Sequence, residues 1–433
     1  MSEEVAVAPV TKAARVASLD VLRGIAVLGI LMMNITAFGL LPQAYGNPLV
    51  EGGADGPNHL AYVIINVGFE GTMRGIFSLL FGASLVLLTG RMEKAGAGIM
   101  AAEVHFRRML WMLLFGIIHW TLMLWYGEIL FNYAMCGLLL FSMRKLSPRV
   151  HIIFAVVLLL GAATFQTVHY RSVAKKEVAA AAAQGAKDSG AKLTAVQTKA
   201  IETWKEIVDE NRPTAEKAAK IRREHSGSYV AAVTGQLGTS YQFQWTEAPF
   251  WLVFDMIPFM LLGMAMLNLG ILGGTASART YWLMLAIGYG IGLPLGIYEL
   301  NLLLDGNFSP TAFAKSGRTY QLSRLAMVVG HLGLALLIIR AGLFKALQRA
   351  LAATGQMALS NYLAQTIICT ALFYGFGLGL YGAFERYQLY YIVAAIWAVE
   401  LIWSPLWLRF YRFGPFEWLW RSLTYWQRQP MRV

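Results

Sequence analysis

Charged residues are scarce in this sequence, and cysteine is nearly absent. Asp, Glu, Lys and Arg make up 14% of the 433 residues, whereas about 25% is usual in soluble domains. Cys136 and Cys369 both lie in apolar runs, which argues against a disulfide framework and favours buried free thiols. There is no phosphate-binding loop, no GxSxG or HExxH motif, and no Cys/His spacing typical of a metal site. The signatures of soluble enzymes are therefore missing, and we expect no metal.

The composition is that of an integral membrane protein. Hydrophobic residues make up 57% of the chain, and several apolar runs approach the ~20 residues that cross the hydrocarbon of a bilayer. Most of the net charge of +12 lies in short loops beside these runs, where Lys and Arg fix orientation and meet anionic lipid. We therefore expect membrane lipids as partners and no nucleic acid.

The apolar runs predict an all-α bundle of about ten membrane spans. Every second loop is basic, and Lys12 and Arg15 precede the first run, which predicts cytoplasmic termini. That first run is too long for the apolar core of a cleavable signal, so we expect it to remain as an anchor. The predicted spans cover residues 20–42, 62–90, 106–126, 128–144, 150–170, 249–272, 281–304, 322–341, 356–381 and 388–410.

These spans divide the chain into five predicted parts. The longest polar segment is rich in Ala, Lys and Glu, so it is expected to form a helical cap outside the membrane rather than an independent enzyme domain. The parts are a cytoplasmic tail (1–17), a bundle of five spans (18–170), the extracytoplasmic cap (171–248), a second bundle of five spans (249–410), and a cytoplasmic interfacial tail (411–433).

The first apolar run, residues 18–34, contains polar side chains that a lipid-facing helix does not tolerate. On a helix with 100° per residue, Arg23 and Asn34 project within about 20° of each other. Asp20 lies one turn before Arg23, within reach of an ion pair. A charge in the bilayer is costly unless it faces protein or water. We therefore predict a polar stripe that runs from the cytoplasmic end toward mid-membrane and faces the interior of the bundle.

The second run also carries polar residues at helical spacing. If it is one helix, His59, Asn66 and Glu70 lie within about 40° of one another. Glu70 and Arg74 at i, i+4 would then neutralise each other, either as a structural pair at a bend or as part of a site. His59 lies near the outer boundary, where a solvated surface histidine is the simpler interpretation.

Further ionisable groups lie in the later runs. His119 lies about two-thirds of the way across the third span, and Glu128 lies at the predicted outer turn after it. With a pKa near 6.5, an intramembrane histidine suits a base or proton carrier, although a core histidine is the alternative. Asp255 is expected to be solvated at the outer interface, and Glu400 is expected to find a partner inside the bundle.

Several stretches together resemble the YeiB family of bacterial inner-membrane proteins, over nearly the whole chain except residues 171–248. They are SLDVLRGIAVLGILMMNITAFGL with YGNP, FSLLFG, GIIHWTLMLWYGEIL, GQMALSNYLAQTIICTALFYGFGLGLYG and GPFEWLWRSLTY. That family is grouped with a transmembrane acyltransferase superfamily that includes the lysosomal heparan-alpha-glucosaminide N-acetyltransferase. Its members take an acyl group from cytosolic acyl-CoA and pass it to an acceptor on the far side. The resemblance thus implies a multi-pass protein of the bacterial inner membrane that uses acyl-CoA.

The wider resemblance rests on the first helix. The S-x-D-x-x-R-G start and the later Asn correspond to Asp20, Arg23, Gly24 and Asn34. The acetyltransferase also uses a histidine after this helix, and His59 lies in a comparable place, although the loop lengths differ.

The leading hypothesis is acyl transfer across the membrane. Such chemistry needs a base for the acceptor, a donor for the oxyanion and a basic mouth for the CoA phosphates. His119 is the preferred base and His59 the alternative, with Glu128 or Glu70 to orient it and Asn34 as the oxyanion donor. The predicted binding residues are Asp20, Arg23, Glu70, Arg74, Arg107, Arg108, Asn361 and Gln365.

Two other functions stay open at this point. A transporter or exporter of a small amphiphile would use the same polar interior without forming a bond, although no internal repeat is visible. A lipid- or quinone-binding scaffold would need only the aromatic lining. The acyl acceptor is not indicated, and a homo-oligomer is neither favoured nor excluded.

Overall fold

The computed structural model describes residues 16–433, and this part of the chain is built almost entirely from helices. It contains no β-strand, and an isolated antiparallel bridge joins Tyr411 to Arg432. The predicted all-α class is thus confirmed. Lys12 and Arg15, on which the placement of the N-terminal tail partly depended, lie outside the described residues.

The helices follow one another through short connections. Those labelled η are a 3₁₀ turn (η2) and two π-helical turns (η3 and η4). In chain order the elements are α1 (Ala17–Gly39), η2 (Pro42–Tyr45), α2 (Pro57–Gly68), α3 (Thr72–Lys94), α4 (Met100–Thr121), α5 (Leu130–Leu140), α6 (Pro148–Asp188), α7 (Ala195–Asn211), α8 (Ala215–His225), α9 (Tyr229–Gln242), η3 (Phe243–Glu247), α10 (Ala248–Trp251), η4 (Leu252–Met256), α11 (Ile257–Asn268), α12 (Ala278–Asp305), α13 (Pro310–Ser316), α14 (Tyr320–Arg340), α15 (Lys345–Gln356), α16 (Ala358–Phe373), α17 (Arg386–Phe410) and α18 (Pro415–Tyr425).

Seven helical segments of the described chain are long and apolar enough to cross a membrane, so the chain is a membrane protein. They are Ala17–Gly39, Pro57–Lys94, Pro148–Asp188, Tyr229–Asn268, Ala278–Asp305, Tyr320–Arg340 and Arg386–Phe410.

The other three predicted spans correspond to α4, α5 and α16. α4 has 22 residues and α16 has 16, whereas α5 has only 11. At 1.5 Å per residue α5 extends roughly 16 Å, about half of the ~30 Å of hydrocarbon. The structure therefore differs from the full span predicted at 128–144, because α5 is a half-length helix.

A break divides the second predicted span. α2 ends at Gly68 and α3 begins at Thr72, and Gly71 between them has a φ of +65°. A Cβ atom on Gly71 would collide with the Tyr320 hydroxyl and with the Arg324 side chain, so glycine suits this left-handed position. Residues before and after the break do not share one helix, and the prediction of a continuous helix is wrong here.

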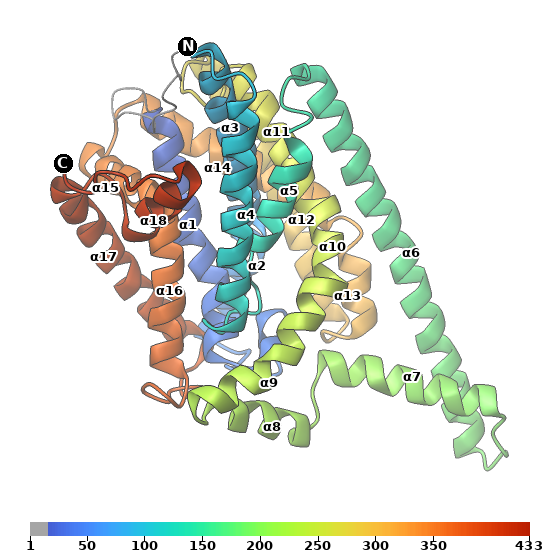
Figure 1. Cartoon of the computed structure of the whole chain (residues 1–433). Coiled ribbons are helices and arrows are strands. Elements are labelled where there is room, and N and C mark those ends of the chain that lie inside the picture. The colour runs from blue at the N-terminus through green and yellow to red at the C-terminus, as the bar shows by residue number, and fades with distance from the viewer. Residues whose placement is uncertain (1–15) are drawn as a thin grey trace.

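α1 lies inside the bundle, where it packs against α3, α15, α16 and α17 (Figure 1). Leu22, Leu31 and Ile35 on this helix are at most 1% exposed, and inside a membrane bundle such side chains stabilise the fold through close van der Waals packing. Gly24 lets α15 approach closely, because a Cβ atom there would collide with the Leu351 carbonyl oxygen. The helix with the predicted polar stripe is therefore surrounded by protein.

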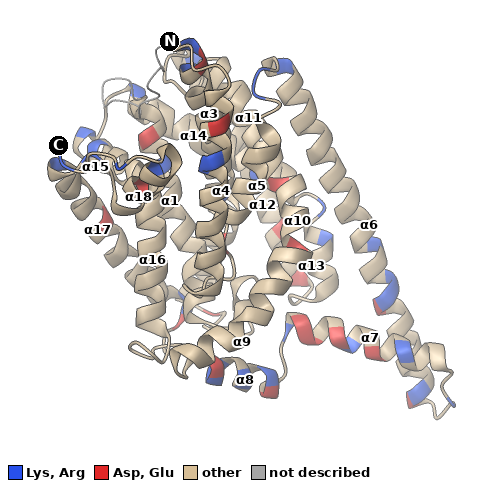
Figure 2. Ribbon diagram, in the orientation of Figure 1, with Lys and Arg blue, Asp and Glu red and all other residues tan. Residues whose placement is uncertain are grey.

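Residues 171–248 are largely helical, as their composition predicts. α6 continues beyond the bundle, and α7 and α8 lie at the end of the molecule opposite the C-terminus (Figure 1). Side chains of Thr194, Thr214 and Ser228 cap the starts of α7, α8 and α9, which sets where each helix begins. Charged residues of both signs line α7 and α8 (Figure 2), as expected for helices that face water.

The predicted end of the cap at residue 248 falls inside a continuous helical path. α9, η3, α10, η4 and α11 follow one another from Tyr229 to Asn268. The returning part of the insertion is thus the first part of the next long apolar segment, and it enters the bundle.

Candidate functional site

One face of α1 lines three cavities that follow one another through the bundle. Arg23 lines the inner cavity, Asn34 the middle chamber and Thr36 the outer cavity. Ile30 borders both the inner cavity and the middle chamber, and Met33 borders both the middle chamber and the outer cavity. Arg23 and Asn34 are eleven residues apart on α1, which is roughly 16 Å along its axis.

The inner cavity has a volume of about 240 Å³ and a basic mouth. Arg23, Arg91, Arg108 and Arg421 line it at the end of the bundle where α1 begins, and Figure 2 shows basic residues gathered at this end. Its walls become apolar toward the middle of α1. The apolar lining includes Val27, Ile30, Phe77, Phe81, Met109 and Met112.

Neighbouring groups hold two of these arginines in place. Arg23 donates to Asp20 at 2.9 Å and to Ser84 at 3.0 Å, so the predicted Asp20–Arg23 pair is confirmed. The Arg108 guanidinium lies 4.0 Å from the centre of the Trp420 ring, in a cation–π contact. The mouth therefore presents positive charge above an apolar pocket, which suits an amphiphile with an anionic head.

The middle chamber has a volume of about 50 Å³. Asn34, Arg74 and Gly71 line it, and its remaining wall includes Tyr45 and Tyr362. The Asn34 side-chain amide has no hydrogen-bond partner in the described part of the chain, so its donor is free for a group in the chamber. Since a cavity of ~10–15 Å³ on this scale holds one water, the chamber accepts only a few atoms of a ligand.

The outer cavity has a volume of about 220 Å³ and a polar, aromatic lining. Glu70, Glu299, Arg324 and Arg386 are its ionisable groups apart from tyrosines. It lies at the end of α1 opposite the inner cavity. The tyrosines that line it are Tyr45, Tyr62, Tyr320 and Tyr390.

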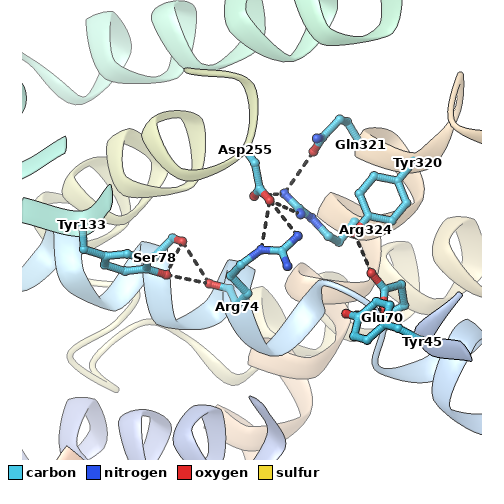
Figure 3. A network of polar contacts seen from close by, with 9 residues as sticks. All are labelled: Tyr45, Glu70, Arg74, Ser78, Tyr133, Asp255, Tyr320, Gln321 and Arg324. Atoms are coloured by element: carbon cyan, nitrogen blue, oxygen red, sulfur yellow. Dashed lines mark hydrogen bonds and ion pairs between the residues drawn. The ribbon is translucent and has the colours of Figure 1, made fainter. Parts of the chain in front are cut away.

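Arg74 lines the chamber and Arg324 lines the outer cavity, and both belong to a buried ion cluster (Figure 3). Asp255 is fully buried and accepts from Arg74 Nη2 at 2.8 Å and from Arg324 Nη1 at 2.7 Å. Arg324 also donates to Gln321 at 3.0 Å. The expectation of a solvated Asp255 is therefore wrong, because this buried carboxylate is shared by two guanidinium groups that come from α3 and α14.

Glu70 does not pair with Arg74, so the predicted i, i+4 pair is also wrong. The helix break at Gly71 separates them, and Arg74 turns to Asp255 instead. Glu70 accepts hydrogen bonds from Tyr45 Oη at 3.0 Å and from Tyr320 Oη at 3.1 Å (Figure 3). Tyr45 lines both the outer cavity and the chamber. The Tyr45 hydroxyl therefore links the Glu70 carboxylate to the wall of the chamber.

His119 and Glu128 are both fully buried and lie beside each other. His119 Nδ1 is 3.5 Å from Glu128 Oε1, and Nε2 is 2.9 Å from Thr366 Oγ1. The Glu128 carboxylate also accepts from the backbone N–H groups of Leu130 and Phe131 at the start of α5. Neither residue lines any of the three cavities, so the preferred base is shielded from the chamber rather than open to it.

The segment 122–129 that carries Glu128 is largely covered by other parts of the protein, although Leu122 at its start is exposed. Leu124 and Trp125 are at most 3% exposed, and Trp125 stacks on Phe38 of α1 with ring centres 4.1 Å apart. Gly127 and Ile129 line the middle chamber. The backbone polar groups of this covered loop need hydrogen-bond partners within the protein.

α9 and η3 satisfy that backbone. Tyr229 Oη donates to the Leu122 carbonyl at 2.6 Å, Gln236 to the Leu124 carbonyl at 3.0 Å, and Gln244 to the Glu128 carbonyl at 3.1 Å. Residues 229, 236 and 244 are seven and eight positions apart, which places them on one helical face. The insertion thus fixes the loop that positions Glu128.

The remaining predicted residues lie away from the cavities. His59 is exposed near the start of α2. Arg107 is paired with Glu103 at 2.9 Å on the α4 surface, unlike its neighbour Arg108.

Asn361 and Gln365 tie α16 to its neighbours. Asn361 donates to Ser404 at 3.1 Å, and Gln365 donates to Glu400 at 3.1 Å. Glu400 thereby has the partner predicted for it. Neither amide lines a cavity described above, and a ligand-binding role for them stays a prediction.

Several cavity residues that matter below were not among the predicted site residues. Tyr45 and Tyr362 join neighbouring cavities, and Arg324 and Arg386 line the outer one. A signal existed only for the arginines, since a buried arginine inside or beside an apolar run calls for a partner.

Comparisons with known proteins agree on one family. A family model described as "Protein of unknown function (DUF418)" matches residues 266–427. "Uncharacterized protein YeiB" of Escherichia coli (strain K12) is 31% identical over 94% of this chain and 95% of its own length. "Uncharacterized protein YxaH" of Bacillus subtilis (strain 168) is 29% identical, with 96% of each chain covered. No solved structure matches the chain.

Proposed function

Because this chain belongs to the YeiB family of bacterial membrane proteins, we propose from its cavities that it is a transmembrane acyltransferase of the inner membrane. It moves a short acyl group from cytosolic acyl-CoA to an acceptor that enters from the opposite side. The observation that carries this proposal is the arrangement of two cavities at opposite ends of α1, with a chamber of about 50 Å³ between them. Each ligand has its own cavity, and only their reacting groups fit between them.

The inner cavity suits acyl-CoA. Its arginines offer the forked donors that bind phosphates, and its apolar depth accepts the pantetheine arm. Since Arg23 and Asn34 are roughly 16 Å apart along α1, an extended arm with its phosphates near Arg23 brings the thioester to Asn34. The small volume of the chamber favours a short acyl group over a long chain.

The chamber supplies the groups that acyl transfer needs. The Asn34 amide donates to the oxyanion that forms when the acceptor attacks the thioester carbonyl. Glu70, reached through the Tyr45 hydroxyl, takes the proton of the acceptor hydroxyl or amine. A bond forms between the acceptor and the acyl carbon, the C–S bond breaks, and the CoA thiolate leaves into the inner cavity. In this scheme His119 positions Tyr362 and is not itself the base.

The test uses purified protein in liposomes, with radiolabelled acetyl-CoA on the side of the basic mouth and amino sugars, polyols or lipids as acceptors. We expect label in an acceptor with wild type and about 10²–10³-fold less with Asn34→Ala or Asn34→Asp, as for loss of an oxyanion donor. Labelling that persists unchanged in both variants would contradict the mechanism.

A transporter of a small amphiphile is the second candidate, because the three cavities lie in series. The narrow chamber disfavours it, since an intact amphiphile does not fit through without rearrangement of α1 and α3. Flux of such a molecule into protein-containing liposomes without acyl-CoA would favour transport over transfer.

A further inference from the structure

We propose that the outer cavity binds an acceptor with an anionic oxygen group, a carboxylate or a phosphate, and that Arg386 and Tyr390 bind this group. That the bound ligand is the acyl acceptor rests on the proposed function. The existence of an anion site at Arg386 rests on separate observations. It commits the outer ligand to a small anionic alcohol, amine or sugar, either free in water or as the headgroup of a lipid.

Arg386 is a buried cation without a counter-charge. Its side chain is 2% exposed, lines the outer cavity and forms no ion pair with any described residue. Its Nη2 donates to the Ala44 carbonyl, whereas its buried Nε has no partner. A buried arginine is normally paired, since desolvation of an unpaired charge is costly. Arg324 lines the same cavity and likewise has a buried Nε without a partner, but it differs from Arg386 because it donates to the Asp255 carboxylate.

Arg386 and Tyr390 lie one turn apart at the start of α17. Arg386 is the first residue of this helix, and the Glu385 carboxylate before it caps the helix start. Tyr390 lies one turn further on the same face and also lines the cavity, and its hydroxyl lies beside the Arg386 guanidinium. An oxyanion between them would accept hydrogen bonds from both side chains.

The site lies next to the reacting groups. The Ala44 carbonyl that accepts from Arg386 belongs to η2, and the next residue, Tyr45, borders the middle chamber and bonds to Glu70. An anion at Arg386 is therefore close to the point where the acceptor meets the acyl group. A volume of about 220 Å³ is small for a ligand pocket, so it fits a single sugar or headgroup rather than a polymer.

The other ionisable groups of the cavity do not replace the missing counter-ion. The Glu70 carboxylate is held by two tyrosine hydroxyls, and Glu299 accepts from Thr319 at 2.7 Å. Glu385, beside Arg386 in sequence, accepts instead from Asn58 at 2.9 Å.

The experiment measures thermal stabilisation of the full-length protein by paired probes. In detergent, glycerol 3-phosphate is compared with glycerol, and glucuronate with glucose. In lipid nanodiscs, phosphatidylglycerol is compared with phosphatidylcholine. We expect the anionic member of at least one pair to raise the melting temperature more than the neutral member. We expect Arg386→Gln to raise the apparent Kd of the anionic probe, taken from the concentration dependence of the melting temperature, about tenfold or more, as for loss of a charged hydrogen bond.

Controls separate the site from general charge effects. Arg318→Gln removes a cation from the loop before α14, where Arg318 packs on Tyr170 with its Cζ atom 4.7 Å from the ring centre and does not line the cavity. We expect this variant to respond like wild type, and Tyr390→Phe to respond less. A rise in melting temperature with the soluble anionic probes identifies a soluble acceptor. A rise confined to phosphatidylglycerol identifies a lipid acceptor.

The inference is overturned if neutral and anionic probes act equally on wild type, or if Arg386→Gln keeps the full response. The comparison on wild type does not depend on whether the variant folds. Probe binding without label transfer would reject the acyltransferase and keep the anion site. Label transfer to neutral acceptors without anion-specific stabilisation would support the acyltransferase and reject the anion site.

Discussion

His119 and Tyr362 pack edge to face with ring centres 5.0 Å apart, and of the two only Tyr362 lines the inner cavity and the middle chamber. The histidine is thus one layer behind the cavity wall. Its contacts with Glu128 and Thr366 fix the ring against which Tyr362 rests. This relationship is the reason for assigning the base to Glu70.

The two candidates for the base predict different pH profiles. We expect Glu70→Gln to reduce kcat by about 10²–10⁴-fold, the usual contribution of a general base. We expect His119→Gln, which keeps a hydrogen bond to Thr366, to change kcat by less than about tenfold and to leave its pH dependence unaltered. The measurement is kcat from pH 5 to 9 in liposomes. If His119→Gln removes the acidic limb of the profile, the histidine is the base after all.

Arg107 and Arg108 are adjacent in sequence but differ in position, which provides a matched pair of variants. Arg108 lines the inner cavity, whereas Arg107 is paired with Glu103. We expect Arg108→Gln to raise KM for acetyl-CoA about tenfold, as for loss of a charged phosphate contact. Arg107→Gln should leave KM within about twofold. Equal effects of both changes would indicate a surface potential rather than a phosphate site.

The cluster of Asp255 with Arg74 and Arg324 predicts a large change in stability. Asp255→Asn leaves two buried guanidinium groups without their carboxylate, and we expect a loss of about 3–5 kcal/mol in the free energy of unfolding. Unfolding by SDS titration in mixed micelles measures it. Adding Arg324→Met to Asp255→Asn should recover part of the loss, since one unpaired charge is removed. A single variant as stable as wild type would show that water replaces the ion pairs.

The hydrogen bonds from α9 and η3 predict that the insertion controls the site from a distance. We expect Gln236→Leu and Gln244→Leu to lower kcat, because each leaves buried carbonyl groups of the loop 122–129 unpaired. Each should also lower the free energy of unfolding by about 1–3 kcal/mol. Thr198→Val, on exposed α7, is the matched control, with little change expected in either quantity. Full activity in both glutamine variants would contradict a positioning role for α9.

His225 predicts a pH dependence of stability. Burial lowers the pKa of His225 in the folded protein, where its ring stacks on Tyr381 with centres 4.5 Å apart. The neutral form is favoured on folding, so its contribution is complete above the ordinary pKa near 6.5 and is lost as pH falls toward the lowered value. We expect the melting temperature of wild type to fall between pH 7.5 and 5.0 by more than that of His225→Gln. An equal fall in both proteins would assign the effect to other groups.

The local features of the site could be predicted from the sequence, and its long-range pairings could not. Helical periodicity alone placed Arg23 and Asn34 on one inward face of α1, and the Asp20–Arg23 pair is a contact within one turn. By contrast, Arg74 finds Asp255 at a distance of 181 residues along the chain. Only the packing of α3 against η4 and α14 brings such groups together, and the sequence near either residue does not indicate this contact.

The burial of the loop around Glu128 could also not be predicted from the sequence, for a physical reason. Gly127-Glu128 has the composition of an exposed turn, and the groups that bury it lie more than a hundred residues later, at Gln236 and Gln244. The break at Gly71 is a similar case. Its glycine is visible in the sequence, but the Tyr320 and Arg324 side chains that require it come from α14.

The half-length of α5 has a consequence for how the protein is made. An 11-residue helix is too short to enter the bilayer as a span of its own, so α4, the loop and α5 must insert together as a hairpin. The carbonyl groups at the tip of that hairpin find their donors only on residues 229–244. The first half of the chain therefore lacks these hydrogen-bond donors until residues 229–244 have been made and have packed against it.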